Sequence, residues 1–170
     1  MTYGAIALGF GFGLAAAVAH GFDAVGTELY QGFIDACREQ GLTVYPGTIE
    51  GIPFPDQSCQ VVFLDDVLEH LDQPFDYLKE IARVLEPGGV AMIHTWVIDK
   101  PTTVQAAFGE EWRSNLNLDL TAHTTIFPTQ LLLDQLEQRG LVHVAAASSW
   151  TAGSEAASAI QFCDFYLRKI

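Results

Sequence analysis

The sequence predicts an α/β fold with an open, mostly parallel sheet, and two observations carry this prediction. Short apolar stretches alternate with helix-length stretches between residues 5 and 96, as in successive βαβ units. Residues 58–66 form a nearly continuous apolar run that ends in Asp65 and Asp66, which is typical of a parallel strand buried on both faces. A chain of 170 residues can bury a sizeable core, so we expect a single domain over residues 1–170.

The glycine-rich run after the first expected strand organises this pattern. Apolar residues 5–8 precede three alternate glycines, and the alanine-rich residues 14–20 follow as an expected helix. Glycine permits positive φ and lets a ligand approach the main chain, while the first N–H groups of a helix point outward. We therefore take Gly9, Phe10, Gly11 and Gly13 as candidate cofactor-binding residues, although a purely structural turn also uses glycine.

A second expected strand, residues 22–28, ends in Glu28. An acid at the end of the second strand of a βαβ unit reaches the ribose hydroxyls of a bound cofactor. Dinucleotide-binding proteins and S-adenosylmethionine (SAM) proteins both use this arrangement. Glu28, with the adjacent Leu29, is the candidate ribose contact, and a merely solvated strand-end glutamate is the alternative.

The remaining elements continue the alternation and end in a hairpin. The linker between the last two strands is too short for a crossover helix, so we expect those strands to pair antiparallel. The irregular segment 97–127 is expected to be an excursion, or lid, on the ligand side. The expected helices are 30–41, a short turn at 68–71, 75–85 and 128–139; the expected strands are 42–45, 58–66, 90–96, 141–147 and 159–167.

Composition restricts the partners and the compartment. The formal net charge of −13 disfavours nucleic acid and anionic membrane surfaces, so a small molecule or a protein is the expected partner. No apolar run predicts a membrane span. Cys37, Cys59 and Cys163 show no CxxC spacing, which argues against disulfides and structural zinc. We therefore expect a cytoplasmic protein with no metal site.

Two stretches carry a resemblance to a known family. Residues 67–71 (VLEHL) and 78–89 (LKEIARVLEPGG) resemble class I SAM-dependent methyltransferases, and most closely the small-molecule branch that includes the quinone-biosynthesis enzymes. Residues 47–56 are similar to the adenine-side loop of that branch, and His123 with residues 127–131 is similar to the segment before its penultimate strand. The resemblance extends over essentially the whole chain.

The resemblance implies a fold, a cofactor and a reaction. The fold is a Rossmann-like sheet of seven strands with the last one antiparallel and helices on both faces. The reaction is methyl transfer from SAM to a small molecule, with S-adenosylhomocysteine (SAH) as the product. The implied cofactor contacts further along the chain are Thr48, Ile49, Glu50, Asp65 and Asp66.

The sequence departs from the family at three places. Ala7 stands where the family has an acid that holds the cofactor's amino group, and Thr48 stands where it has the acid that meets the adenine amino group. The N-terminal helices that usually cover the site are expected to be missing. Loss of one charge-assisted hydrogen bond costs about 1.5–3 kcal/mol, roughly a tenfold to hundredfold loss of affinity.

The candidate catalytic bases are His94, His70 and His123, since transfer to a hydroxyl requires removal of a proton. His94 is expected to end its strand at the ligand edge, although a structural histidine is the alternative for all three. Two other functions remain open: an inactive SAM-fold domain used for binding or assembly, and a nicotinamide dinucleotide enzyme. Phe108, Trp112 and Leu116 recur at helical spacing and suggest a homodimer interface.

Overall fold

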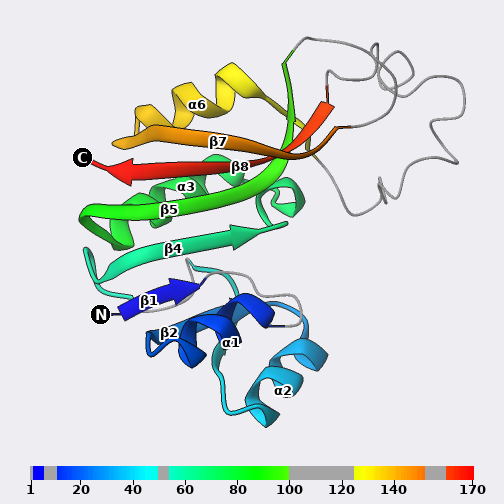
Figure 1. Ribbon diagram of the computed structural model, residues 1–170, viewed down its shortest axis with the longest axis vertical. Coiled ribbons are helices and arrows are strands. Elements are labelled where there is room, and N and C mark those ends of the chain that lie inside the picture. The colour runs from blue at the N-terminus through cyan, green and yellow to red at the C-terminus, as the bar shows by residue number, and fades with distance from the viewer. Residues whose placement is uncertain (1, 6–10, 50–53, 100–124, 152–159) are drawn as a thin grey trace, which may run out of the picture.

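The computed structural model describes residues 2–5, 11–49, 54–99, 125–151 and 160–170. One open sheet runs through the molecule in the order β3-β2-β1-β4-β5-β8-β7, and the short β6 pairs with β5 beside this path (Figure 1). The predicted α/β class is confirmed. The strands are β1 (Thr2–Ala5), β2 (Asp23–Glu28), β3 (Thr43–Pro46), β4 (Cys59–Asp65), β5 (Leu85–Ile98), β6 (Phe127–Pro128), β7 (Leu141–Thr151) and β8 (Ile160–Lys169).

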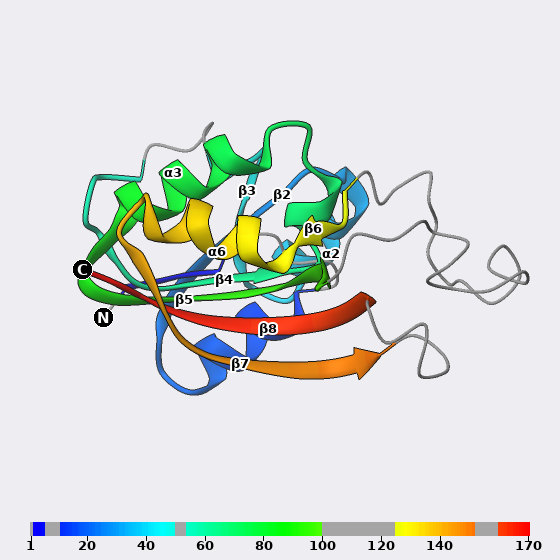
Figure 2. The ribbon, with the colours of Figure 1, turned by 90° about the horizontal axis from the view of Figure 1, so that it is seen from above.

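The helices cover the two faces of the sheet unequally. α3 and α6 lie on one face, and α1 lies on the other (Figure 2). No described helix is long and apolar enough to cross a membrane. The helices are α1 (Phe12–Ala19), α2 (Gln31–Glu39), the 3-10 helix η2 (Leu68–His70), α3 (Pro74–Val84) and α6 (Thr129–Glu137).

The core is divided in the same way. The larger cluster packs α3 and α6 against β4, β5 and β8; on β5 it takes Ala91, Ile93 and Val97, as the two-residue period of a strand requires. The smaller cluster packs α1 and α2 against β2 and β3, through residues such as Leu14, Ile34 and Cys37. β1 pairs in parallel with β2 and with β4, so the carboxyl ends of these three strands lie at the same edge of the sheet.

The last two strands form the predicted hairpin. β8 pairs antiparallel with β7 on one side and with β5 on the other, whereas β1, β2, β3, β4 and β5 pair in parallel. The pairing with β5 aligns His94 with Asp164, and the parallel pairing with β4 aligns His94 with Asp65. Three strands thus place these three residues in one row across the sheet.

Several element boundaries differ from the prediction. The first strand begins at Thr2 rather than at residue 5, and α1 begins at Phe12, so Gly13 is a helical residue. β5 continues to Ile98, so His94 lies inside the strand and not at its end. β5 begins at Leu85 rather than at the predicted residue 90, and its pairing with β4 jumps from Leu85 to Val90.

Candidate cofactor site

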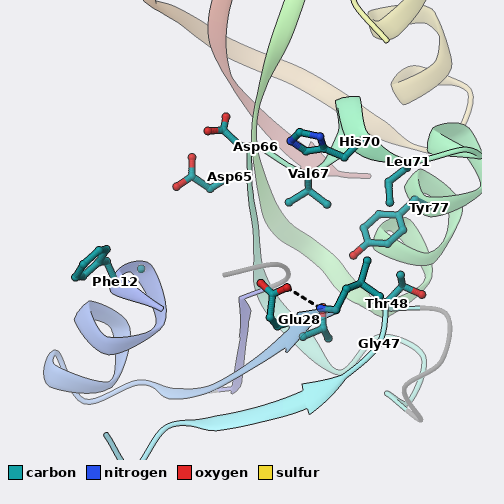
Figure 3. A pocket seen from close by; sticks show the side chains of 13 residues that line it. Phe12, Glu28, Gly47, Thr48, Asp65, Asp66, Val67, His70, Leu71 and Tyr77 are labelled. Atoms are coloured by element: carbon teal, nitrogen blue, oxygen red, sulfur yellow. Dashed lines mark hydrogen bonds between the residues drawn. The ribbon is translucent and has the colours of Figure 1, made fainter. Parts of the chain in front are cut away.

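A hollow of about 430 Å³ opens at the carboxyl ends of β2 and β4, which is where ligands bind in open parallel α/β sheets. Its size falls in the range of small-molecule sites. Figure 3 shows Phe12 of α1 at one end, Glu28 in the middle, and Thr48, Leu71 and Tyr77 at the other end. The lining residues are Phe12, Gly13, Thr27, Glu28, Leu29, Gly47, Thr48, Asp65, Asp66, Val67, His70, Leu71 and Tyr77.

Glu28 is held in the hollow by the two residues that precede α2. Its Oε1 accepts the N–H of Leu29 at 2.7 Å and the N–H of Tyr30 at 2.8 Å. The N–H of Gly47 donates to the backbone carbonyl of Glu28 at 2.9 Å, which brings the loop with Thr48 alongside. The carboxylate therefore has a fixed orientation beside the middle of the hollow.

The two described glycines of the run have structural roles. Gly11 caps α1 with φ +76°, a left-handed conformation that glycine adopts without cost. A Cβ at Gly11 would lie 2.6 Å from the Sγ of Cys37, and a Cβ at Gly13 would lie 3.1 Å from the ring of Phe63. Glycine thus lets α1 approach both α2 and β4, and Gly13 also lines the hollow.

The far end of the hollow has apolar walls and a polar edge. Leu29, Leu71 and Thr48 line both this hollow and an adjoining one of about 350 Å³, as do His70 and Tyr77. Leu29 is 71% exposed, whereas Tyr77 is 2% exposed. An exposed apolar side chain next to a buried phenol is a suitable setting for a flat ring with polar groups on one edge.

Acidic groups and a histidine meet where β4 ends. The Nδ1 of His94 lies 2.8 Å from the Oδ1 of Asp65 and 3.8 Å from that of Asp66, and its Nε2 lies 3.8 Å from the Oδ1 of Asp164. Asp66 has φ +53° and donates its N–H to the carbonyl of His94 at 3.3 Å. His94 is thus flanked by carboxylates on both sides, next to two residues that line the hollow.

The same cluster bears on the expectation of no metal site. One ligand atom from each of Asp65, Asp66 and His94 lies within 4.8 Å of the others, a donor set that suits several divalent cations. The absence of a metal therefore stays a prediction.

A buried acid supports the turn behind the hollow. Glu69 of η2 is 0% exposed and accepts a hydrogen bond from the Oγ1 of Thr95 at 2.8 Å. Burial raises the pKa of the Glu69 carboxyl above its ordinary value, and the hydrogen bonds to it oppose that shift only in part. The backbone carbonyl of Glu69 also accepts the N–H of Thr125 at 3.2 Å. Glu69 thereby links η2 to β5 and to the segment before β6.

The structure brings most of the predicted site residues together. Gly13, Glu28, Leu29, Thr48, Asp65, Asp66 and His70 line the hollow. Gly11 is buried beneath it, Ile49 lies in the larger core cluster, and His94 lies beside Asp65. Gly9, Phe10, Glu50 and His123 are outside the described residues, as are Ala7 and the suggested interface residues Phe108, Trp112 and Leu116.

Sequence reasoning missed Phe12 and Tyr77 as lining residues. Phe12 was predicted to lie in the glycine loop, and its 78% exposure at the start of α1 has no signal in the sequence. Tyr77 belongs to the apolar period of α3, so its pattern indicates core. The only available signal was its hydroxyl, since a buried tyrosine usually places that group at a polar partner or a cavity.

Comparisons with known proteins agree with this geometry. A family model described as "Methyltransferase domain" matches residues 5–93, which is more than half of the chain. The 2-methyl-6-phytyl-1,4-hydroquinone methyltransferase of Synechocystis is 28% identical over 101 residues, which cover 59% of this chain and 32% of that protein. The biotin biosynthesis bifunctional protein BioHC of Cellvibrio japonicus is 31% identical over 93 residues, which cover 53% and 18%.

Solved structures extend the similarity to the whole fold. A SAM-dependent methyltransferase from Archaeoglobus fulgidus superposes with a TM-score of 0.74 at 18% identity, and covers 99% of this chain and 86% of that one. At this identity the likeness concerns the fold alone. The chain spans no more than about a third of the two curated relatives above. The comparisons do not favour an inactive binding domain or a nicotinamide enzyme.

Proposed function

Since this chain belongs to the family of SAM-dependent methyltransferase domains and its cofactor is SAM, we propose that it transfers a methyl group from SAM to a small-molecule acceptor. The observation that carries the proposal is the fixed carboxylate of Glu28 in the middle of a hollow at the carboxyl ends of β2 and β4. A carboxylate held by two N–H groups is ready to accept both ribose hydroxyls without reorganisation.

The residues along the hollow fit the parts of the cofactor in order. Gly13 and the start of α1 would face the amino-acid end, Glu28 the ribose, and Leu29 with Thr48 the adenine. Asp65 and Asp66 add negative charge near the bound sulfonium. Gly9, Phe10, Ile49 and Glu50 stay proposed contacts from the resemblance. Bound SAM supplies an electrophilic methyl carbon, and the chain's part is to orient the acceptor and remove its proton.

We assign the proton-accepting role to His94, with His70 and His123 as the other candidates. Asp65 accepts a hydrogen bond from Nδ1 when that nitrogen carries the proton, and this tautomer leaves Nε2 as the nitrogen that can take a proton from the acceptor. His70 lines the hollow from η2. His94→Asn should lower kcat by about 10²–10⁴-fold while the Kd for SAH stays within twofold, and His70→Asn is the matched comparison.

The charge of the hollow bears on the acceptor. None of the described residues that line it is Lys or Arg, while Glu28, Asp65 and Asp66 are acidic. An acceptor with a carboxylate or phosphate near the reacting atom would meet repulsion here. A neutral or cationic small molecule is the class that this lining favours.

Calorimetric titration with SAH tests the proposal, with NADH as the comparison ligand. We expect SAH to bind with a one-to-one stoichiometry and NADH to show no heat of binding. Saturable binding of NADH but not of SAH would overturn the proposal. If SAH binds but no labelled methyl group is transferred from SAM to any of a panel of small hydroxyl and amine acceptors, the non-catalytic alternative is supported instead.

Three further proposals accompany this function. We propose that residues 1–170 act as one domain with a seven-stranded main sheet path. We also propose that residues 97–127 lie on the acceptor side and that the chain forms a homodimer through that segment. A cytoplasmic location fits three thiols that are buried and unbridged.

Light scattering across a concentration series, with Trp112→Ala beside the wild type, tests the dimer. A wild-type monomer at high micromolar concentration would overturn it.

A further inference from the structure

The adenine end of the hollow has lost the family's acid, and the structure shows which polar groups remain there. Thr48 occupies the position of that acid, and its hydroxyl is short. Tyr77 reaches the same space from the first turn of α3, where its N–H donates to the carbonyl of Gln73 at 3.3 Å. Figure 3 shows the Tyr77 hydroxyl directed away from α3 and toward the space beside Thr48.

The ring of Tyr77 packs in the core, whereas the residue also borders the hollow. The residue is 2% exposed and belongs to the larger core cluster, so the ring is fixed by packing. Yet Tyr77 lines both the main hollow and the adjoining one, together with Leu29 and Leu71. A polar group on an immobilised ring loses little conformational entropy when it binds a ligand, whereas an exposed side chain at the same place would lose more.

We propose that the Tyr77 hydroxyl recognises the 6-amino group of the cofactor's adenine, in place of the missing acid. The inference rests on the proposed function, because it requires the adenosyl group to lie with its ribose on Glu28. From Glu28 the hollow continues to Thr48, Leu71 and Tyr77 (Figure 3). Leu29 and Leu71 provide apolar contacts for the purine faces, and the hydroxyl lies where a polar edge is needed.

The chemistry of a phenol makes this role specific. A hydroxyl has one donor and two acceptor lone pairs, so it can accept from an amino group and, by rotation of its O–H, donate to an oxygen in the same place. A carboxylate only accepts. Asp72, the carboxylate that lines the adjoining hollow, is exposed and does not line the main one, and water screens its charge.

A cycle of protein and ligand changes tests the proposal. The ligands are SAH and an SAH analogue with hydrogen in place of the 6-amino group, titrated calorimetrically into the wild type and into Tyr77→Phe. In the wild type, removal of the amino group should raise Kd about three- to tenfold, the worth of one neutral hydrogen bond. In Tyr77→Phe the Kd for SAH should rise by the same factor, and the two ligands should then differ by less than twofold.

Matched variants identify the group that responds. Asp72→Asn removes the charge of the adjoining hollow and should keep the full preference for SAH, whereas Thr48→Val measures what the neighbouring hydroxyl contributes to it. A Tyr77→Phe protein that discriminates as strongly as the wild type would overturn the proposal. If the wild type does not bind SAH, the proposed function itself fails, and the inference fails with it.

A measurement on the wild type alone covers the case in which Tyr77→Phe does not fold. An SAH analogue with a 6-oxo group presents an acceptor instead of a donor. Because a hydroxyl can donate to it, the 6-oxo analogue should bind more tightly than the 6-hydrogen analogue. If a carboxylate reads this position, the order reverses, since two acceptors would then face each other. A reversed order would exclude Tyr77 as the recognising group.

Discussion

Glu28 has a structural and a binding role that two substitutions can separate. Its Oε1 accepts the N–H groups of Leu29 and Tyr30 just before α2, at 2.7 and 2.8 Å, while its charge faces the hollow. Glu28→Gln retains an oxygen that can accept these N–H groups and removes only the charge. Glu28→Ala removes both, so the difference between the variants reports the contribution of Glu28 to the turn before α2.

The expected magnitudes follow from the kinds of hydrogen bond involved. Hydrogen bonds to charged groups contribute about 1.5–3 kcal/mol and neutral ones about 0.5–1.5 kcal/mol. Glu28→Gln should therefore raise the Kd for SAH about five- to tenfold, and Glu28→Ala about ten- to hundredfold. Only Glu28→Ala should also lower the free energy of unfolding, by about 1 kcal/mol, because the N–H groups of Leu29 and Tyr30 lose their acceptor.

Calorimetry with SAH and urea unfolding measure the two effects independently. Glu39→Gln is the control, since it removes the same charge from an exposed position at the other end of α2 and should change neither quantity. If Glu28→Ala binds SAH as tightly as the wild type does, the ribose assignment is refuted. If Glu28→Gln destabilises the fold as much as Glu28→Ala does, the charge rather than the acceptor oxygen stabilises the turn before α2.

Four further predictions concern the loop, the buried acid and the sheet. Gly11→Ala should lower the free energy of unfolding by about 1–2 kcal/mol because its φ is positive. Contact of the new Cβ with the Sγ of Cys37 should add to this loss, and Cys37→Ala should remove only the added part in urea titrations. Glu69→Gln should raise Tm at neutral pH, because a raised folded-state pKa costs stability above the unfolded pKa; the gain should vanish in melts below that pKa, and a constant gain would contradict this. Lys169→Met should cost about 1–2 kcal/mol in urea unfolding, since Nζ donates to the carbonyls of Ala82 and Leu85. Ala7→Asp should tighten SAM binding in calorimetry, and an unchanged Kd would mean that another group holds the amino end.

The sequence allowed the sheet to be predicted because its signals are local. The apolar run before Asp65 and the stop signals at Gly41 and Gly140 mark where elements end, and the hairpin follows from linker length. The start of α1 was missed because Gly13 has a low helix propensity, which here is outweighed by close packing on Phe63. β6 has only two residues, too few to produce any periodicity.

The site could be predicted only where residues follow a strand end. Glu28, Asp65 and Asp66 each do so, and their convergence follows from parallel strands alone. The contact of His94 with Asp164 depends on the register of an antiparallel pairing between strands far apart in the chain, which no local pattern specifies. The Tyr77 hydroxyl was hidden because the ring satisfies the apolar period of α3.

The central place of β8 in the sheet has a consequence for synthesis. β8 pairs on one side with β5, from Val90 opposite Arg168 to Ile98 opposite Ile160, and on the other side with β7. Among the described strands β7 has no other neighbour, so its backbone stays unpaired until residues 160–169 have left the ribosome. During translation the nascent chain therefore exposes two strand edges, those of β5 and β7, to chaperones or to other nascent chains.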